Sequence, residues 1–310
     1  MTQDFLRYQE VVHHKGVPYT PASKNTFPII VADLTHRCNM TCANCYIPNR
    51  DVPDMDADRF METIKAFPQR VELRLMGAEA TMRKDLPELI SRIKKETRHR
   101  AILLTNGLRL AHKRYTEELK SAGLQYVYVS MNGADNDDWY EVIDEMRCAK
   151  KKIRAMENLL ECKFTVDTGT ILQNPVNLEA PGRLYNLLKS IGYTRGVMRF
   201  KNVGQIGRFS IEQEENLPMR ELHDRVCEQL GVDPDWAWTQ DLVDGSREKN
   251  SRFFSVDGSA HRGRGFWAKI TNWNVETNNP DPNSIRRGRI TENFMVAPFF
   301  EHVATNEGGY

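Results

Sequence analysis

The strongest constraint on the fold is a regular alternation of short apolar runs and amphipathic helical patterns, which continues from about residue 28 to residue 203. The apolar runs, rich in β-branched residues, predict strands at 28–34, 71–76, 101–107, 125–133, 163–172 and 197–203. Helical patterns fall between them, at 56–67, 85–96, 115–123, 184–192 and near 216–230, with one long helix expected from Trp139 to Leu160. Six strand–helix units in a row predict an α/β fold around a parallel sheet. An open doubly wound sheet and a barrel both satisfy this pattern.

The residues after this alternation have a different character. Residues 231–310 are rich in Asn, Pro, Gly and Arg, and their one alternating run is FWAKITNWNV at 266–275. We interpret them as an irregular, partly β extension that packs on the main domain, since their apolar content is low for an independent core, and a small second domain is the alternative. The expected division is an N-terminal extension (1–27), a core (28–230) and a C-terminal extension (231–310).

Three cysteines follow the first predicted strand within the short segment LTHRCNMTCANCY at 34–46. Cys38, Cys42 and Cys45 have the spacing C-x3-C-x2-C. In a reducing compartment such a tight cluster indicates a metal site. Three thiolates on one loop can each bind one iron of an iron–sulfur cube and leave the fourth iron open for chemistry. A structural zinc site is the alternative, with His36 or a distant cysteine as the fourth ligand.

The composition argues against several classes of function. Lys and Arg number 43 against 42 Asp and Glu, so the net charge of +1 gives no sign of a nucleic-acid-binding surface. No apolar stretch is long enough to span a membrane, and the N-terminus MTQDFLRYQE has no apolar signal core, so the expected location is the cytoplasm. Cys148, Cys162 and Cys227 are isolated, which favours incidental thiols over a second cluster.

The cysteine segment resembles the signature of radical S-adenosylmethionine (radical SAM) enzymes. The family places its C-x3-C-x2-C motif after the first strand, and here Leu-Thr precedes the motif, Asn39 follows the first cysteine and Tyr46 the third. The family often has an aromatic residue where this chain has Asn44, a position that contacts adenine through its backbone. The resemblance covers about residues 28–208. It implies one [4Fe–4S] cluster on the three cysteines, SAM as the second cofactor, and a partial (β/α)6 barrel.

A second match follows the second predicted strand, in MGAEATMRKDLPELI at 76–90. It resembles the family's GGEP motif, which binds the amino group of SAM, and the matching positions are Gly77, Ala78, Glu79 and Ala80. Glycine permits close approach of backbone carbonyls, and a carboxylate pairs with an ammonium. The two alanines depart from the motif at its second glycine and its proline. Without the resemblance, Glu79 would be interpreted as a solvated surface carboxylate.

Weaker matches lie at the ends of later strands, where barrel enzymes place their chemistry. By resemblance, polar residues there contact SAM, and the candidates, with Tyr46, are Asn106, Ser130, Asn132, Thr170 and Arg208. Thr168 and Thr170 are expected to face the barrel interior. Each candidate also suits an ordinary turn or cap.

The resemblance also implies the reaction. SAM is cleaved reductively, with an electron from a reduced flavodoxin or ferredoxin, to methionine and a 5′-deoxyadenosyl radical that abstracts hydrogen from the substrate. We expect a small polar substrate, anionic or sugar- or nucleoside-like, in the biosynthesis of a specialised metabolite or cofactor. Peptide modification is the alternative, and an iron–sulfur electron carrier or a zinc protein is the alternative of another class.

The substrate contacts are expected in the C-terminal extension, closing over the open barrel. Arginines beside aromatic residues suit an anionic or hydroxylated ligand. The candidates are Arg286, Arg289, Glu301 and His302. A solvated basic loop is an equally good interpretation of this segment.

Overall fold

The computed structural model describes residues 19–43, 45, 47, 50–202, 217–243, 251–261, 263–271, 287–291 and 293–298. The strands are β1 (Ile29–Thr35), β2 (Glu72–Gly77), β3 (Arg100–Thr105), β4 (Tyr126–Ser130), β5 (Thr165–Leu172), β6 (Arg195–Asn202), β7 (Ser251–Ser255), β8 (Gly265–Thr271), β9 (Arg287–Ile290) and β10 (Val296–Pro298). The α-helices are α2 (Ala57–Lys65), α3 (Leu86–Glu96), α4 (Lys113–Ala122), α5 (Asp137–Asp144), α6 (Ala149–Glu161), α7 (Ala180–Ser190), α9 (Met219–Leu230) and α10 (Pro234–Val243).

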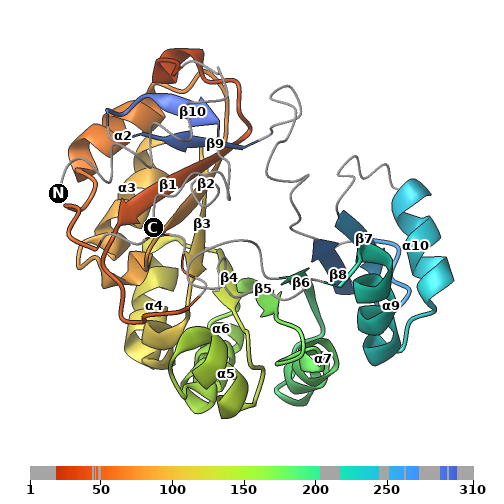
Figure 1. Cartoon of the computed structure of the whole chain (residues 1–310). Coiled ribbons are helices and arrows are strands. Elements are labelled where there is room, and N and C mark those ends of the chain that lie inside the picture. The colour runs from red at the N-terminus through yellow and green to blue at the C-terminus, as the bar shows by residue number, and fades with distance from the viewer. Residues whose placement is uncertain are drawn as a thin grey trace.

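These strands form one curved sheet in the order β10-β9-β1-β2-β3-β4-β5-β6-β8-β7. Every neighbouring pair from β9 to β8 is parallel, while β10 and β7 are antiparallel strands at the two edges. The helices lie along the outer, convex side, and the described part of the chain places no helix inside the curve (Figure 1). The predicted α/β fold with a parallel sheet is confirmed, and the arrangement is an open barrel.

The hydrophobic core lies between the convex face of the sheet and the helices. Ile30, Leu73 and Leu103, from three successive strands, are buried there with Phe60 of α2 and Ile90 of α3. Side chains alternate between the two faces along a strand. The residues between these core positions therefore point to the concave face.

Local capping explains where several helices begin and end. The Asp56 side chain accepts a hydrogen bond from the Arg59 N–H at 2.8 Å and starts α2. The Asn136 side chain does the same for α5. Gly123 ends α4 with a left-handed φ of 109°, a conformation that costs glycine little.

The single long helix expected from Trp139 to Leu160 is wrong. The helix breaks at Glu145, which has a left-handed φ of 52° and ends α5 before α6 starts. A carboxylate oxygen of Asp137 accepts a hydrogen bond from the Ala149 N–H at 2.7 Å, which ties the start of α6 to the start of α5. Helical periodicity continues across the break because each helix buries one apolar face: Tyr140 and Ile143 of α5 pack against residues of the cysteine loop, and Met156 of α6 packs in the main core.

The described part of residues 231–310 contributes α10 and the strands β7 to β10. β8 and β7 extend the sheet beyond β6, while β9 and β10 extend it beyond β1. Edge strands gain main-chain hydrogen bonds from an existing sheet, so they form without a large apolar core of their own. Strands from this C-terminal segment thus form both edges of the open barrel's sheet.

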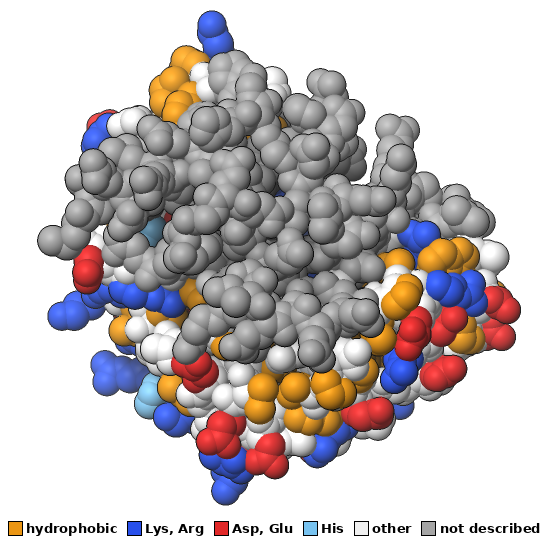
Figure 2. Space-filling view, viewed as in Figure 1, with side chains coloured by type: hydrophobic (Ala, Val, Ile, Leu, Met, Phe, Trp, Pro, Cys, Tyr) orange, Lys and Arg blue, Asp and Glu red, His pale blue; other side chains and the backbone are white. Residues whose placement is uncertain are grey.

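None of the helices in the described ranges is long and apolar enough to cross a bilayer. On the face shown in Figure 2, the acidic and basic side chains of the described residues are interspersed around the outline of the molecule. Interspersed charges of both signs produce only a weak long-range field.

Candidate active site

The cysteine loop follows β1 directly, at the edge where the parallel strands end. Cys38, Cys42 and Cys45 are free thiols, and all three are half-buried. The Ala43 N–H donates a hydrogen bond to the Ile143 carbonyl oxygen at 3.2 Å. This bond anchors the loop to α5 between its second and third thiol.

Burial is the main influence on the pKa of two of these thiols. It raises the pKa of Cys38 and of Cys42 above the ordinary thiol value, because a thiolate would lose hydration there. At the third position, Arg50 Nη2 donates a hydrogen bond to Cys45 Sγ at 3.1 Å. Bound iron would hold all three groups as thiolates, since metal coordination deprotonates a thiol.

The chemistry of the donor set fits an iron–sulfur cluster. One loop supplies three free thiols, the ligand type that such clusters bind. Among the described side chains, no three from His, Cys, Asp or Glu converge on a single metal ion. A [4Fe–4S] cube does not require such convergence, because each thiolate binds a different iron.

The loop after β2 lies beside the start of the cysteine loop. The Ala78 N–H donates to the Thr35 carbonyl oxygen at 2.9 Å, and the Glu79 N–H donates to the Arg37 carbonyl oxygen at 3.0 Å. Gly77 has a φ of +124°, and a Cβ at this position would lie 2.2 Å from the Thr35 oxygen. Glycine is therefore required for the close approach of β1 and β2 at this edge.

Glu79 is buried, with 1% of its surface exposed. Its Oε1 accepts hydrogen bonds from the Thr81 N–H at 3.0 Å, the Thr81 hydroxyl at 2.6 Å and the Thr105 hydroxyl at 2.7 Å. Its Oε2 accepts one from the Asn106 N–H at 2.6 Å. The interpretation as a solvated surface carboxylate is wrong, because these donors hold the side chain inside the protein. The carboxylate joins the ends of β2 and β3.

Asn106 continues this network to the cysteines. Its Nδ2 donates a hydrogen bond to Asn39 Oδ1 at 2.8 Å and lies 3.9 Å from Cys38 Sγ. Its Oδ1 accepts one from the Leu108 N–H at 3.0 Å, which fixes the orientation of the amide. Cys38, Glu79 and Asn106, which come from three different strand ends, are thus in one hydrogen-bonded group.

A sequence model of the Radical SAM superfamily matches residues 33–188 of this chain, a segment that contains this group. The chain belongs to the radical SAM superfamily. Members of the superfamily are enzymes, and this one uses their cofactors, a [4Fe–4S] cluster and SAM.

Relatives with curated names share this core. The chain is 28% identical over 221 residues to 7,8-dihydro-6-hydroxymethylpterin dimethyltransferase of Methanocaldococcus jannaschii, covering 66% of this chain and 43% of the relative. It is 36% identical over 220 residues to Fe-coproporphyrin III synthase of Methanosarcina barkeri, covering 66% and 51%. The chain therefore spans about half the length of these two relatives.

One solved structure has a similar fold. Streptococcus suis SuiB bound to the precursor peptide SuiA superposes with a TM-score of 0.61 at 15% identity, covering 98% of this chain and 65% of SuiB. At this identity the likeness concerns the fold alone.

Ser130 and Asn132 of this radical SAM chain lie at the end of β4, as expected. The Asn132 side chain is 4% exposed, donates to Asp144 Oδ1 at 2.7 Å and accepts from the Ile171 N–H at 2.9 Å. The amide thus links the end of β5 to the end of α5. The Ser130 carbonyl oxygen accepts a hydrogen bond from Lys152 Nζ at 2.8 Å.

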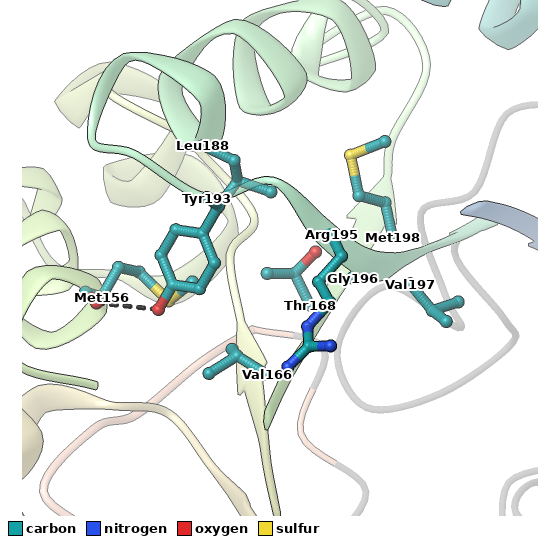
Figure 3. Close-up of a pocket in the computed structure, with 9 residues that line it drawn as sticks. All are labelled: Met156, Val166, Thr168, Leu188, Tyr193, Arg195, Gly196, Val197 and Met198. Carbon is teal, nitrogen blue, oxygen red and sulfur yellow. Dashed lines mark hydrogen bonds between the residues drawn. The ribbon is translucent and has the colours of Figure 1, made fainter. Parts of the chain in front are cut away.

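The expectation that Thr168 and Thr170 face the barrel interior is wrong. Thr168 lies on the helix side, beside Val166 (Figure 3), and the Thr170 hydroxyl donates to the Met131 carbonyl oxygen at 3.0 Å. The concave face of β5 carries Asp167, Gly169 and Ile171 instead. Apolar and β-branched residues occupy both faces of this strand, so the sequence pattern does not mark which face is inside.

The pocket in Figure 3 is consequently not part of the active site. It lies between β5, β6 and the helices α6 and α7. Its lining residues are Met156, Val166, Thr168, Leu188, Tyr193, Arg195, Gly196, Val197 and Met198. The Thr168 hydroxyl has no hydrogen-bond partner among the described residues, and most of its neighbours are apolar.

Of the four candidate substrate contacts, Arg289 is the one that lies among the described residues. Arg289 lies on β9, 2% exposed, next to Val31 of β1 in the sheet register. It acts on Asp33 electrostatically: burial raises the pKa of Asp33, and the nearby Arg289 and His36 oppose that rise. Outside the described residues lie Tyr46, Arg208, Arg286, Glu301 and His302.

Sequence reasoning missed a buried ion pair under the cysteine loop. Lys152 of α6 is 0% exposed, and its Nζ lies 3.9 Å from Asp144 Oδ2. Both charges act electrostatically on Cys42. The sequence signal that could have indicated this ion pair is a lysine in the apolar stripe of α6, where Ala149, Lys152 and Met156 share the buried face.

Proposed function

We propose that this enzyme cleaves SAM reductively and uses the resulting 5′-deoxyadenosyl radical to abstract hydrogen from a small polar substrate. The substrate would be anionic or sugar- or nucleoside-like, in the biosynthesis of a specialised metabolite or cofactor. The observation that carries the proposal is the hydrogen-bonded group at the strand ends. It connects the Cys38 thiol through Asn106 to Glu79, in a loop that resembles the family's SAM-binding motif.

The chain's own residues would divide the work at this edge. The three thiols would hold the cluster, which when bound supplies the electron for SAM cleavage. Gly77 and Ala78 would line the SAM site through their backbone, with Asn106 and Ser130 beside it. Glu79 would position Asn106 and keep the loops in place. A reduced flavodoxin or ferredoxin would supply the electron to the cluster.

The concave face would hold the substrate and exclude water from the radical. Parts of residues 231–310 lie at both edges of the barrel as β7, β8, β9 and β10. We propose that this C-terminal segment supplies substrate contacts, with Arg286, Arg289, Glu301 and His302 as candidates.

Relatives support two substrate classes. Two relatives are named for a pterin and for Fe-coproporphyrin III, which favours a small molecule. A third relative, 24% identical over 197 residues, is a PqqA peptide cyclase of Granulibacter bethesdensis, which keeps peptide modification as the second candidate.

The deciding experiment is anaerobic reconstitution with iron and sulfide, followed by incubation with SAM and dithionite. We expect 5′-deoxyadenosine to form, detected by chromatography and mass spectrometry. The variant in which all three cysteines are alanine is the matched control and should form none. An iron–sulfur electron carrier would bind iron without producing 5′-deoxyadenosine, and that result would overturn the proposal.

A further inference from the structure

The side chain of Arg50 contacts the third cysteine of the proposed cluster site. Its Nη2 donates a hydrogen bond to Cys45 Sγ at 3.1 Å, from a position that lies outside the C-x3-C-x2-C segment. The Cys45 thiol in turn donates toward the Ile47 carbonyl oxygen, at a distance of 3.5 Å. The sulfur therefore lies between a carbonyl acceptor and a guanidinium donor.

The other terminal nitrogen of this guanidinium is buried without a hydrogen bond. Arg50 Nη1 has no hydrogen-bond partner in the part of the chain that the structure describes. A buried donor in this state has lost its hydration and gained nothing in return, which folded proteins rarely leave uncompensated. Such an atom, next to a cofactor ligand, indicates an acceptor that arrives with the cofactor.

The charge of Arg50 is directed at sulfur. Arg37, which precedes the first cysteine, is a useful comparison, because its Nε donates to Asp54 Oδ1 at 3.2 Å in an ion pair. Arg50 has its hydrogen bond to Cys45 instead. Its charge also reaches Cys38: burial raises the pKa of that thiol, and Arg50 opposes the rise. The guanidinium thus acts on the first and third cysteines together.

Buried neighbours hold the backbone on both sides of Cys45. Ala43 is 8% exposed and packs against Ile143 of α5, and Ile47 is 5% exposed. These two residues fix the segment that carries the thiol. The contact between Cys45 and Arg50 is therefore part of a packed loop.

Iron binding would strengthen this contact. A coordinated cysteine is a thiolate, so the thiol proton that Cys45 directs at Ile47 would be gone, and Arg50 would donate to a charged sulfur. Hydrogen bonds between two charged groups are roughly twice as strong as neutral ones. Hydrogen bonds to the sulfurs of an iron–sulfur cluster set its reduction potential, because they favour the form that carries the extra electron.

We propose that Arg50 binds the sulfur side of the cluster, with Nη2 on the Cys45 thiolate and Nη1 on a cluster sulfide, and so raises the reduction potential. This inference rests on the proposed function, since it requires the cluster on the three cysteines. The step that Arg50 assists is the transfer of one electron from the reduced flavodoxin or ferredoxin to the oxidised cluster. No bond forms or breaks in that step.

The test is a redox titration of the reconstituted enzyme, monitored by electron paramagnetic resonance in the absence of SAM. We expect Arg50→Met to shift the reduction equilibrium about tenfold toward the oxidised form, which is a fall of about 59 mV for one electron. Arg50→Lys keeps the charge without the planar fork, so its potential should lie between those of the parent and Arg50→Met. Arg154→Met, exposed on α6, is the matched control and should titrate as the parent does.

Iron content is measured on every sample, so that only loaded sites are compared. If Arg50→Met loses its iron, Arg50→Gln replaces it as the neutral variant, and its potential should also fall. If both neutral variants lose their iron, Arg50→Lys decides: a potential below that of the parent supports the proposal, and an equal potential overturns it. Equal or raised potentials in a loaded neutral variant overturn it as well.

Two further measurements separate this inference from its alternatives. Titration with SAM gives the affinity of each variant, and a roughly tenfold weaker dissociation constant at unchanged potential would assign Nη1 to the SAM carboxylate and overturn the cluster contact. Formation of 5′-deoxyadenosine by the parent enzyme is measured in parallel. Its absence counts against the proposed function, whereas its presence with equal potentials counts against the role of Arg50 alone.

Discussion

The N–H of Asn106 donates a 2.6 Å hydrogen bond to the buried Oε2 of Glu79, and this contact connects the loop after β3 with the loop after β2. From Asn106 the network continues to Asn39 and approaches the Cys38 thiol. A carboxylate inside the protein thus positions a residue beside the first cysteine. The orientation of the loop depends on buried hydrogen bonds, which are stronger and more directional than exposed ones.

Glu79→Gln should destabilise the fold and weaken SAM binding together. The amide nitrogen must face at least one of the donors from Thr81, Thr105 and Asn106, which leaves a buried donor unsatisfied. The expected loss in free energy of unfolding is about 1–3 kcal/mol, measured by urea titration. Glu88→Gln, on the exposed side of α3, is the control and should change little. Unchanged stability in Glu79→Gln would contradict the hydrogen-bonding role.

Changing Cys38, Cys42 and Cys45 to alanine together should remove the iron. A cubane bound through three thiolates corresponds to about four irons per reconstituted chain, measured by iron assay and by cluster absorption. Cys162→Ala is the matched control, because Cys162 caps the end of α6 away from the loop. Full iron content in the triple variant would mean that the cluster ligands lie elsewhere.

Gly77→Ala should disturb the edge where the cofactors are proposed to bind. A Cβ would lie 2.2 Å from the Thr35 oxygen, at a φ of +124° that alanine disfavours, so the backbone must shift. We expect a loss of at least about 1 kcal/mol in unfolding free energy and weaker SAM binding by titration. Gly263→Ala provides the comparison, since nothing lies within 4 Å of its added Cβ. Equal behaviour of the two variants would refute the steric argument.

Lys152→Met should leave Asp144 as a buried, uncompensated charge. Asp144 Oδ2 has no hydrogen-bond partner among the described residues, and the lysine ammonium at 3.9 Å is its counter-charge. Breaking such a pair costs about 3 kcal/mol, measurable by urea unfolding. Lys150→Met, exposed on the same helix, should cost little. In a double-mutant cycle, Asp144→Asn should recover part of the loss, and strict additivity would show that the two side chains do not interact.

Acid should weaken the fold through His99. Burial lowers the pKa of His99 below 6.5, and its Nδ1 accepts a hydrogen bond from the Val71 N–H at 3.2 Å, a bond that protonation would remove. The contribution of neutral His99 is fully present above pH 6.5 and is lost as pH falls through the lowered folded-state pKa. The urea midpoint of the parent chain should therefore fall on acidification, and by a smaller amount in His99→Gln. The same pH dependence in both chains would exclude His99 as the cause.

Several features of this protein were accessible from local sequence alone. Each predicted strand from 28–34 to 197–203 overlaps a strand of the structure, because apolar periodicity reports burial of one face over a few residues. The spacing of Cys38, Cys42 and Cys45, with the Gly77–Ala80 segment after the second strand, was sufficient to place the chain in its superfamily. Both motifs lie within short segments of the chain. Their positions after the first and second strands do not depend on how the strands and helices pack.

Other features depended on residues far apart in the sequence. The helix break at Glu145 interrupts a periodicity that both helices share. The structure shows it in the left-handed φ of Glu145 and in the hydrogen bond from the Ala149 N–H to Asp137. The solvated interpretation of Glu79 failed because its donors come from the next strand, at Thr105 and Asn106.

By itself, the sequence determined the parallel α/β framework, the cysteine site and the superfamily. Only the tertiary structure decided that Thr168 faces the helices, that Lys152 pairs with Asp144, and that Arg289 lies next to Val31 in the sheet register. Periodicity and spacing are properties of neighbouring residues, so a single chain segment specifies them. The face that a strand residue takes and the charge it meets depend on sheet register and on long-range packing, which exist only after the whole chain has folded.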